Sequence, residues 1–273
     1  MFSKRLPIIG MKIYYEKVYI SMQMKRVKNR GLSDEVKAAI YEYIKSMDIQ
    51  KSNKLPREEV MAELLGVSRI TVRSALNELA TEGIIFRRQG KGTFVNPEAV
   101  QMKVTLNSLE LFMDMIKNSG YSPSVKVLKV ETINASEAIA DKLKIKTGDE
   151  LISIEKLFYA DDNPAVYCIN YIAKGLINQS ISNQEYEIPI FELIKTRTGK
   201  TITWDKVEIY SVTNEGNENL TKYFNCDGKV KPLLLCEGVN YDDANEPIVY
   251  AYEYFDTDYV RFNLIRQKHV NDE

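Results

Sequence analysis

The sequence has 273 residues, of which 44% are hydrophobic, and its formal net charge is −1. This length exceeds the usual span of one domain and predicts two domains. The small net charge hides two opposed parts of the chain. Residues 1–97 hold 18 Lys and Arg against 10 Asp and Glu, whereas residues 98–273 hold 19 against 28. The basic part therefore comes first.

The cysteine content argues against a disulfide framework and against a zinc site, because three cysteines are an odd number and no CxxC spacing occurs. The longest apolar runs fall short of the roughly 20 residues that a membrane span needs. Residues 1–10 lack the continuous apolar core of a signal peptide. We therefore expect a cytoplasmic protein that uses no metal and no cofactor.

Residues 1–30 are expected to form an N-terminal extension, either disordered or lying before the natural start of the protein. The segment before Met24 shows little helical or strand period, so Met22 or Met24 is a candidate start. A basic arm that adds to DNA binding is the alternative, and disorder is the default for such a terminus. The cations of that arm would be Lys4, Arg5, Lys12 and Lys17.

Residues 31–97 contain three helical patterns in succession. Apolar residues recur at steps of three and four from Leu32 to Met47 and again from Arg57 to Leu65. Gly66 suits the end of the second helix, Ser68 can cap the third, and Gly83 closes it. The turn between the second and third helices is about four residues long. This is the spacing of a helix-turn-helix unit.

The exposed side of the third helix carries hydrogen-bond donors. Arg69, Arg73 and Asn77 lie at i, i+4 and i+8 and so share a face, with Ser68 and Thr71 near its beginning. Arginine pairs with guanine and asparagine with adenine in the major groove. Solvated surface residues are the alternative interpretation, but the tight turn before this face favours a recognition helix.

A basic hairpin follows, with the sequence IFRRQGKGTFV at residues 85–95. Residues 84–86 and 93–95 are predicted to form its strands, and residues 89–92 its turn. The glycines let the backbone approach another surface closely. Arg87, Arg88 and Lys91 can neutralise phosphates there. The segment is not a phosphate-binding P-loop, because the GxxxxGK[ST] spacing is absent.

The stretch LPREEVMAELLGVSRITVRSALNELATEGIIFRRQGKGTFV resembles the winged helix-turn-helix of the GntR family of bacterial transcriptional regulators, and the resemblance extends over residues 32–96. It implies DNA contacts at the start of the second helix, on the third helix and in the wing. Arg57 departs from the serine common in the family, so the preferred operator stays open. The predicted DNA-binding residues are Arg57, Ser68, Arg69, Thr71, Arg73, Asn77, Arg87, Gly90, Lys91 and Gly92.

Residues 98–107 are a candidate linker, and residues 108–268 are predicted to form a mixed α/β domain with a largely antiparallel sheet, so that the whole chain is an α+β two-domain protein. Helices are expected at residues 109–118, 136–143, 189–198 and 215–224. Strands are expected at residues 125–133, 151–159, 165–172, 201–212, 233–241 and 248–256.

Two segments of this second domain, residues 157–172 and 239–255, each read as strand, acidic turn, proline and strand, which is typical of a hairpin. Together with ASEAIADKLKIKTGDELISIEKLF they resemble the UTRA effector-binding domain of the HutC branch of GntR regulators, over residues 104–268. That resemblance implies a chorismate-lyase-like fold, a small-metabolite ligand and the dimer contacts.

Relatives in that branch that sense phosphorylated sugars use arginines, helix-start amides and a glutamate. This chain keeps one cation at Lys156, has Phe158 and Cys168 at positions that match an arginine and the glutamate, and places Glu110 near the helix start, where its charge would repel a phosphate. The effector could be a sugar phosphate, an amine or an amino acid. The predicted effector-binding residues are Ser108, Glu110, Lys156, Phe158, Tyr167, Cys168, Tyr171 and Glu237.

Tyrosines alternate along two of the predicted strands, at Tyr167 and Tyr171 and at Tyr250, Tyr252 and Tyr254. They could line a pocket for a ring or a cation. Cross-strand packing pairs are the simpler interpretation.

The sequence therefore predicts a homodimeric transcriptional regulator, a repressor released from a palindromic operator in double-stranded DNA by a small-molecule effector. A lyase-like enzyme with an accessory nucleic-acid-binding domain is the alternative, because fold does not fix function. The only histidine, His269, lies near the C-terminus without nucleophilic partners. Glu237 with Lys156 could form an acid and base, although an ion pair or a ligand clamp is the better interpretation.

Overall fold

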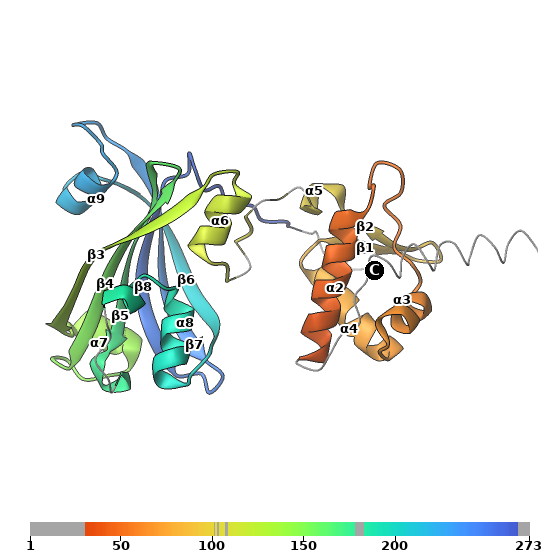
Figure 1. The fold of residues 1–273 in the computed structure, drawn as a ribbon, viewed down its shortest axis with the longest axis horizontal. Helices are drawn as coiled ribbons and strands as arrows, with labels where there is room; N and C mark the ends of the chain where they lie inside the picture. Colours follow the sequence, from red (N-terminus) through yellow and green to blue (C-terminus); the bar gives the residue numbers. More distant parts are fainter. Residues whose placement is uncertain (1–30, 101, 103, 107–108, 178–182, 267–273) are drawn as a thin grey trace, which may run out of the picture. The chain divides into compact units, whose positions relative to one another are not determined.

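The computed structural model describes residues 31–100, 102, 104–106, 109–177 and 183–266. The expected N-terminal extension, Ser108 and His269 lie outside the described residues. The chain divides into two compact units, Met1–Met102 with Leu264–Glu273 and Lys103–Asn263, and Figure 1 shows the elements of each. Among the described residues, no helix is both long and apolar enough to cross a membrane.

The first unit is built on three helices, as the sequence predicts. They are α2 (Leu32–Ser46), α3 (Glu58–Leu65) and α4 (Arg69–Thr81). Their apolar faces meet in one core that includes Ile40, Met61 and Leu76. Gly66 ends α3 in the left-handed region, at φ 69°, and the Ser68 hydroxyl accepts from the Thr71 backbone N–H at 3.1 Å. These two local signals fix the turn between α3 and α4.

The predicted hairpin is present as β1 (Ile85–Arg88) and β2 (Gly92–Val95). Phe86 and Phe94 stack across it with ring centroids 5.9 Å apart. The segment before α3 pairs with the other edge of β2, because Leu55 N–H donates to the Thr93 carbonyl at 2.9 Å. A short helix follows, α5 (Pro97–Val100), inside the stretch that the sequence predicts to be a linker.

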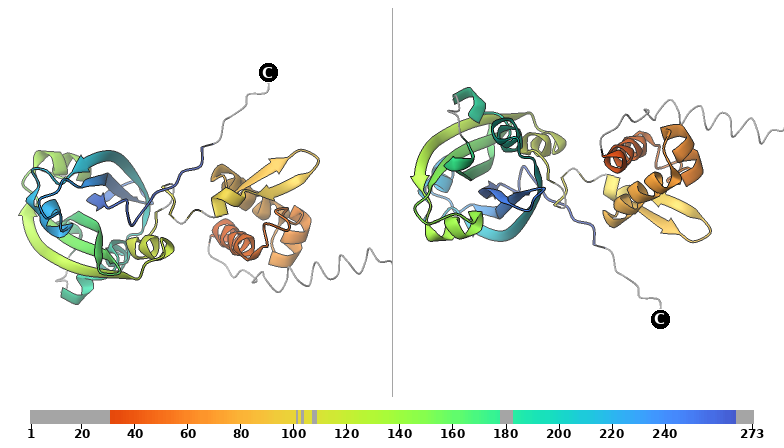
Figure 2. Two further views of the ribbon diagram at one scale, coloured as in Figure 1. Left: turned by 90° about the horizontal axis from the view of Figure 1, so that it is seen from above. Right: turned by 90° about the horizontal axis from the view of Figure 1, so that it is seen from below.

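The second unit is a curved, six-stranded antiparallel sheet with the order β3-β4-β5-β8-β7-β6 (Figure 2). Its strands are β3 (Pro123–Asn134), β4 (Glu150–Ala160), β5 (Asn163–Ala173), β6 (Ile202–Thr213), β7 (Pro232–Asp242) and β8 (Pro247–Phe255). All six were expected from the sequence. The two segments with acidic turns form the hairpins β4-β5 and β7-β8, as predicted.

Four helices cover this sheet, two on each face. On one face, α6 (Phe112–Asn118) and α8 (Ile190–Thr198) pack on the strands. On the other face lie α7 (Glu137–Leu143) and α9 (Glu218–Tyr223). The helices begin up to three residues later than the sequence predicts, and the 3-10 turns η1 (Lys174–Leu176) and η2 (Asn183–Tyr186) were not predicted.

The register of the sheet carries one row of residues straight across all six strands. The row consists of Val127, Lys156, Cys168, Glu253, Cys236 and Ile209. Side chains alternate between the two faces of a strand. The row therefore points to the face of α6 and α8, and residues one position away, such as Tyr167 and Tyr252, point to the face of α7 and α9.

After Asn263 the chain returns to the first unit, whereas the sequence predicts that the second domain continues to residue 268. The described residues 264–266 group with the helix-turn-helix unit. There Ile265 lies against Gly83, at the exit of α4. A Cβ added to Gly83 would come within 2.6 Å of Ile265 Cγ2, so the close approach requires glycine.

We expect Ile265→Ala to lower the local unfolding free energy at the exit of α4 by about 1–2 kcal/mol, because the partly buried isoleucine loses most of its packed side chain. Hydrogen exchange of the Ile84 amide, which donates to the Leu79 carbonyl at 2.9 Å, measures this. Leu264→Ala is the matched control, because Leu264 is 53% exposed. Equal exchange rates in the two variants would contradict the packing role.

Candidate DNA-binding surface and ligand cavity

The exposed face of α4 gathers most of the predicted helix contacts. Arg69, Arg73 and Asn77 are all exposed on one face, while the opposite face of the helix is buried in the core. Ser68 is exposed at the N-cap, and Thr71, half-buried, is held by it through a hydroxyl contact of 2.8 Å. The face therefore presents two guanidinium groups and one amide to solvent, which is what reading of base edges requires.

Two glutamates at the start of α3 hold the arginines of this surface. Arg73 donates from Nε and Nη2 to one oxygen of Glu58, at 3.0 and 2.7 Å. Arg87 of the hairpin reaches the other oxygen of Glu58 at 3.6 Å, and Arg69 lies 2.7 Å from Glu59. The hydrogen bond from Arg73 holds the pKa of Glu58 below its ordinary value. These pairs fix where the guanidinium groups point before any nucleic acid is bound.

The tip of the hairpin is open and basic. Gly90 and Gly92 have positive φ values of 69° and 115°, a conformation that other residues rarely adopt. A Cβ added to Gly90 would meet nothing within 4 Å, so the glycine serves the turn and leaves its outer side free. Arg87, Arg88 and Lys91 are exposed around it, and Arg57 is exposed at the N-cap of α3.

One further residue of this surface, Ile70, did not emerge from the sequence. It is 79% exposed, the largest exposure of any large hydrophobic side chain among the described residues. At 100° per residue it lies between Asn77 and Ser74 on the exposed face of α4. An apolar side chain there suits the methyl group of thymine. The sequence held one signal for this residue: Ile70 is an apolar residue that does not belong to the buried positions recurring at steps of three and four along the helix.

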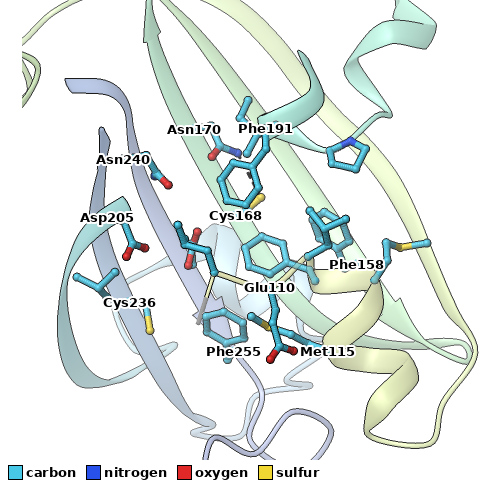
Figure 3. A pocket seen from close by; sticks show the side chains of 18 of the residues that line it. Glu110, Met115, Phe158, Cys168, Asn170, Phe191, Asp205, Cys236, Asn240 and Phe255 are labelled. Carbon is cyan, nitrogen blue, oxygen red and sulfur yellow. Dashed lines mark hydrogen bonds between the residues drawn. The ribbon is translucent and has the colours of Figure 1, made fainter. Parts of the chain in front are cut away.

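The second unit contains a cavity of about 900 Å³ between the sheet and the helices α6 and α8, a size typical of small-molecule sites. Of the predicted effector-binding residues, Glu110, Lys156, Phe158 and Cys168 line it. Figure 3 shows Asn170, Asp205 and Asn240 toward one end, and Met115, Phe158 and Phe255 toward the other.

Three predicted effector-binding residues lie elsewhere, and the structure corrects them. Tyr167, Tyr171 and Glu237 point to the opposite face of the sheet, because each is one position away from a residue that lines the cavity. Tyr167 stacks on Tyr254, and Tyr171 on Tyr250, at centroid distances of 5.9 and 6.0 Å. The tyrosines are therefore cross-strand packing pairs.

The suggested pairing of Glu237 with Lys156 is also wrong. The Tyr250 hydroxyl donates to Glu237 at 2.7 Å, and Lys142 lies 3.4 Å from the same carboxylate. Lys156 lies on the cavity face, where its Nζ donates to the Ile188 carbonyl at 2.6 Å. The sheet itself separates the two side chains.

Sequence reasoning missed most of the polar residues of the cavity, among them Asn170, Asp205, Asn240 and Glu253. The alternation of the tyrosines held a signal for two of them. Glu253 stands between Tyr252 and Tyr254, and Asn170 directly precedes Tyr171. If the tyrosines pack on one face of the sheet, both residues must point to the other face.

The charges in the cavity are unbalanced. Burial and the nearby charge of Asp205 raise the pKa of Glu253 to about 8. Burial also raises the pKa of Asp205. Within the described residues, no hydrogen bond or ion pair reaches the Glu253 carboxylate. Lys156, the one cation among the described lining residues, is 2% exposed, and burial lowers its pKa. It is a poor anchor for a phosphate.

Comparisons with known proteins agree with both halves of this geometry. The UTRA domain matches residues 118–261, and the family described as "Bacterial regulatory proteins, gntR family" matches residues 32–95. The chain belongs to the GntR family, in the group that carries a UTRA domain. Family members are transcriptional regulators, so this GntR-family chain is a DNA-binding transcriptional regulator and not an enzyme.

Individual relatives of this GntR-family regulator support the same assignment. The uncharacterized HTH-type transcriptional regulator YurK of Bacillus subtilis is 28% identical over 76% of this chain and 78% of its own length. The HTH-type transcriptional repressor NagR of the same organism is 28% identical over 72% and 79%. The crystal structure of the possible transcriptional regulator YydK from Bacillus subtilis shares the fold, with a TM-score of 0.67, 18% identity and coverage of 87% of this chain and 100% of that one.

The raised pKa of Glu253 predicts a dependence of stability on pH. Its pKa is higher in the folded regulator than in the unfolded chain, so the folded state binds more protons between about pH 4.5 and pH 8, and its contribution to stability falls as the pH rises through that window. Glu253→Gln removes this loss. We expect the unfolding free energy of the variant to gain on the wild type as the pH rises from 5 to 8, by at most about 1.4 kcal/mol per pH unit. A constant difference in urea unfolding across this range would contradict the assignment.

The exposure of Ile70 predicts a methyl-dependent step in base reading. Replacement of thymine by uracil at one operator position should cost the wild type about three- to tenfold in affinity, and Ile70→Ala should reduce this difference, because the shorter side chain loses most of its contact with the methyl group. Ser74→Ala, on the same exposed face, should keep the preference for thymine. If Ile70→Ala kept the full preference of the wild type for thymine at that position, Ile70 would have no role in base reading.

Proposed function

We propose that this regulator is a cytoplasmic, homodimeric repressor that binds a palindromic operator and leaves it when a small molecule occupies the cavity. The observation that carries the proposal is the combination within one chain of an exposed donor face on α4, an open glycine tip on the hairpin and a cavity of about 900 Å³ in the second unit.

On the operator, α4 would enter the major groove, and the hairpin would reach the adjacent backbone or minor groove. Arg73 is the first candidate for a base contact. Glu58 holds it through Nε and one terminal nitrogen, which leaves further N–H groups of the guanidinium for a guanine edge. Arg88 and Lys91 would meet phosphates, so they supply affinity without sequence preference.

A dimer is supported by the edge strand β6. It ends the sheet order, and it exposes Trp204, Val207, Ile209 and Tyr210, each between 37% and 43%, although the first three also border the cavity. An open edge strand with apolar side chains is a surface that proteins normally cover. A second copy of this chain would cover it, and the two-fold symmetry of such a pair would demand a palindromic operator.

Repression and release follow from relatives and from linkage. Repression is supported by the relative NagR, which is named a repressor. A ligand can release DNA only if it has a higher affinity for a state of the regulator that does not fit the operator than for the state that does. Two chain crossings join the units, one after Met102 and one after Asn263. Thr105 and Asn263 form a parallel bridge within the second unit, and Thr105 also lines the cavity. A ligand in the cavity would therefore contact one of the segments that lead to the DNA-binding unit.

Selection of bound sequences from a random duplex pool, at a stated salt concentration, tests the proposal. We expect a palindrome of two equal half-sites at fixed spacing. Arg73→Ala should lower affinity for it by about 1–3 kcal/mol and relax one base preference in each half-site. Lys91→Ala is the contrasting variant. It should weaken binding to every duplex and reduce the salt slope by about one.

Recovery of a single unrepeated motif would overturn the dimer on a palindrome. Binding that depends only on salt, with no motif, would overturn sequence reading by α4. An Arg73→Ala variant with unchanged affinity and preference would place the base contacts elsewhere on the surface.

A further inference from the structure

The polar groups of the cavity are dominated by hydrogen-bond acceptors and negative charge. Glu110, Glu187, Asp205 and Glu253 contribute carboxylates, and Asn170 and Asn240 contribute amides. The one cation among the described lining residues, Lys156, is already committed to the Ile188 carbonyl. A ligand that matches this inventory must donate hydrogen bonds and carry positive charge.

Asn240 is a buried polar side chain without a partner. It is 5% exposed, and no described residue forms a hydrogen bond with its amide. Figure 3 shows it beside Asp205 at the polar end of the cavity. Buried amides in folded proteins are normally hydrogen-bonded. Asn170 is 4% exposed, and its one side-chain hydrogen bond within the described residues is a weak one to the Cys168 sulfur at 3.5 Å. Both amides are free to meet a ligand.

Glu253 is surrounded by groups that cannot neutralise it. On β5 and β7 its register partners are the thiols Cys168 and Cys236, whose pKa values are raised by burial to about 12, so both stay protonated. On β6, Asp205 adds a second negative charge. Lys156 on β4 lies two strands away, which is roughly 10 Å in a sheet.

Three ligand classes can be compared with this environment. A phosphate or carboxylate would meet more negative charge, which is unfavourable at short range. A neutral polyol could donate to the acceptors but would leave the charges of the half-buried Asp205 and, at alkaline pH, of Glu253 uncompensated. An ammonium group does both, since it donates three hydrogen bonds and supplies the missing charge.

The other end of the cavity is aromatic. Phe112 meets Phe158 and Phe255 edge-on, with centroid distances of 5.0 and 5.6 Å. Phe255 lies two residues along β8 from Glu253 and so faces the same side. An apolar or aromatic group attached to the amine would cover these rings.

We propose that the cavity binds a protonated organic amine, with its ammonium group between Glu253, Asp205 and the Asn240 amide and its apolar part against Phe112, Phe158 and Phe255. The inference rests on the proposed function for the identity of the cavity as the effector site. It narrows the candidate effectors to organic cations and excludes phosphorylated sugars.

The test compares three probes on the full chain: 2-phenylethylamine, its neutral isostere 2-phenylethanol, and glucose 6-phosphate. Like the lysine ammonium, the amine stays protonated below about pH 9. Titration calorimetry at pH 8 should give at least tenfold tighter binding of the amine than of the alcohol, and no binding of the sugar phosphate. Equal binding of amine and alcohol, or preferred binding of the phosphate, would overturn the proposal.

Variants and pH locate the binding site. Glu253→Gln and Asp205→Asn should each lower affinity for the amine at least tenfold and leave affinity for the alcohol unchanged. Glu208→Gln, on β6 but facing away from the cavity, is the matched control and should change neither. Because Glu253 must lose its proton to pair with the cation, the affinity of the wild type for the amine should rise up to about tenfold per pH unit from pH 6 to 8. A flat profile, or equal loss in Glu208→Gln, would contradict the site.

Operator release separates this inference from the proposed function. Cell extract is split by ion exchange into cationic and anionic fractions, and each is added to the regulator on its selected operator. Release by the cationic fraction, lost in Glu253→Gln, supports both proposals. Release by the anionic fraction alone keeps the regulatory function and overturns the amine. If the amine binds as expected but neither fraction releases the operator, the amine site stands and the release mechanism fails.

Discussion

The antiparallel register of the second unit is the constraint on which its chemistry depends. Side chains alternate between faces with a period of two, so a slip of one residue in any strand would exchange the cavity face for the tyrosine face. The pairing of Cys168 with Glu253, and of Glu253 with Cys236, fixes where the carboxylate stands. Residues with positive φ lie at the hairpin turns, Asp161 between β4 and β5 and Asn245 between β7 and β8. They act locally on the register of each hairpin, whereas the register of β5 with β8 joins segments far apart in the chain.

The two units treat charge in opposite ways. On the exposed face of α4, Arg69 and Arg73 are paired with Glu59 and Glu58, so these two positive charges are partly compensated in the free protein, and water screens what remains. In the cavity, Glu253 and Asp205 are desolvated without a cation. The first arrangement orients groups at little cost to stability. The arrangement of carboxylates in the cavity lowers the free energy of unfolding of the free protein. Under the proposal, a cationic ligand would restore this lost stability on binding.

The helices, the strands and the exposed face of α4 could be predicted from the sequence, because each depends on neighbouring residues: apolar period, a capping Ser68, a terminal Gly66. The cavity could be predicted only in part, because it joins strands far apart in the chain. Lys156 and Cys168 were found on one hairpin, whereas Asp205 and Asn240 come from strands whose position in the sheet order is not local information. The tyrosines were misassigned for the same reason, since which face of a strand is the cavity face depends on where the helices pack. The pairing of Glu58 with Arg73 was missed because it joins two helices through a turn.

A ligand can act on DNA binding only through elements whose positions differ between two states, and the segments that join the units are the natural candidates. Thr105 hydrogen-bonds to Glu110 at 3.4 Å, and both line the cavity, so the segment next to the first crossing borders the cavity itself. The second crossing leaves through Asn263, which holds the Val104 carbonyl through backbone and side-chain donors at 3.0 Å each. The two segments are therefore bonded together within the second unit. Because Ile265 packs against Gly83 at the exit of α4, a shift of that pair would, under the proposed function, act on the end of the helix that carries Arg69 and Arg73. Under the proposed function, control of DNA binding by the cavity would need no change inside either core, only a second position for this bonded pair of segments.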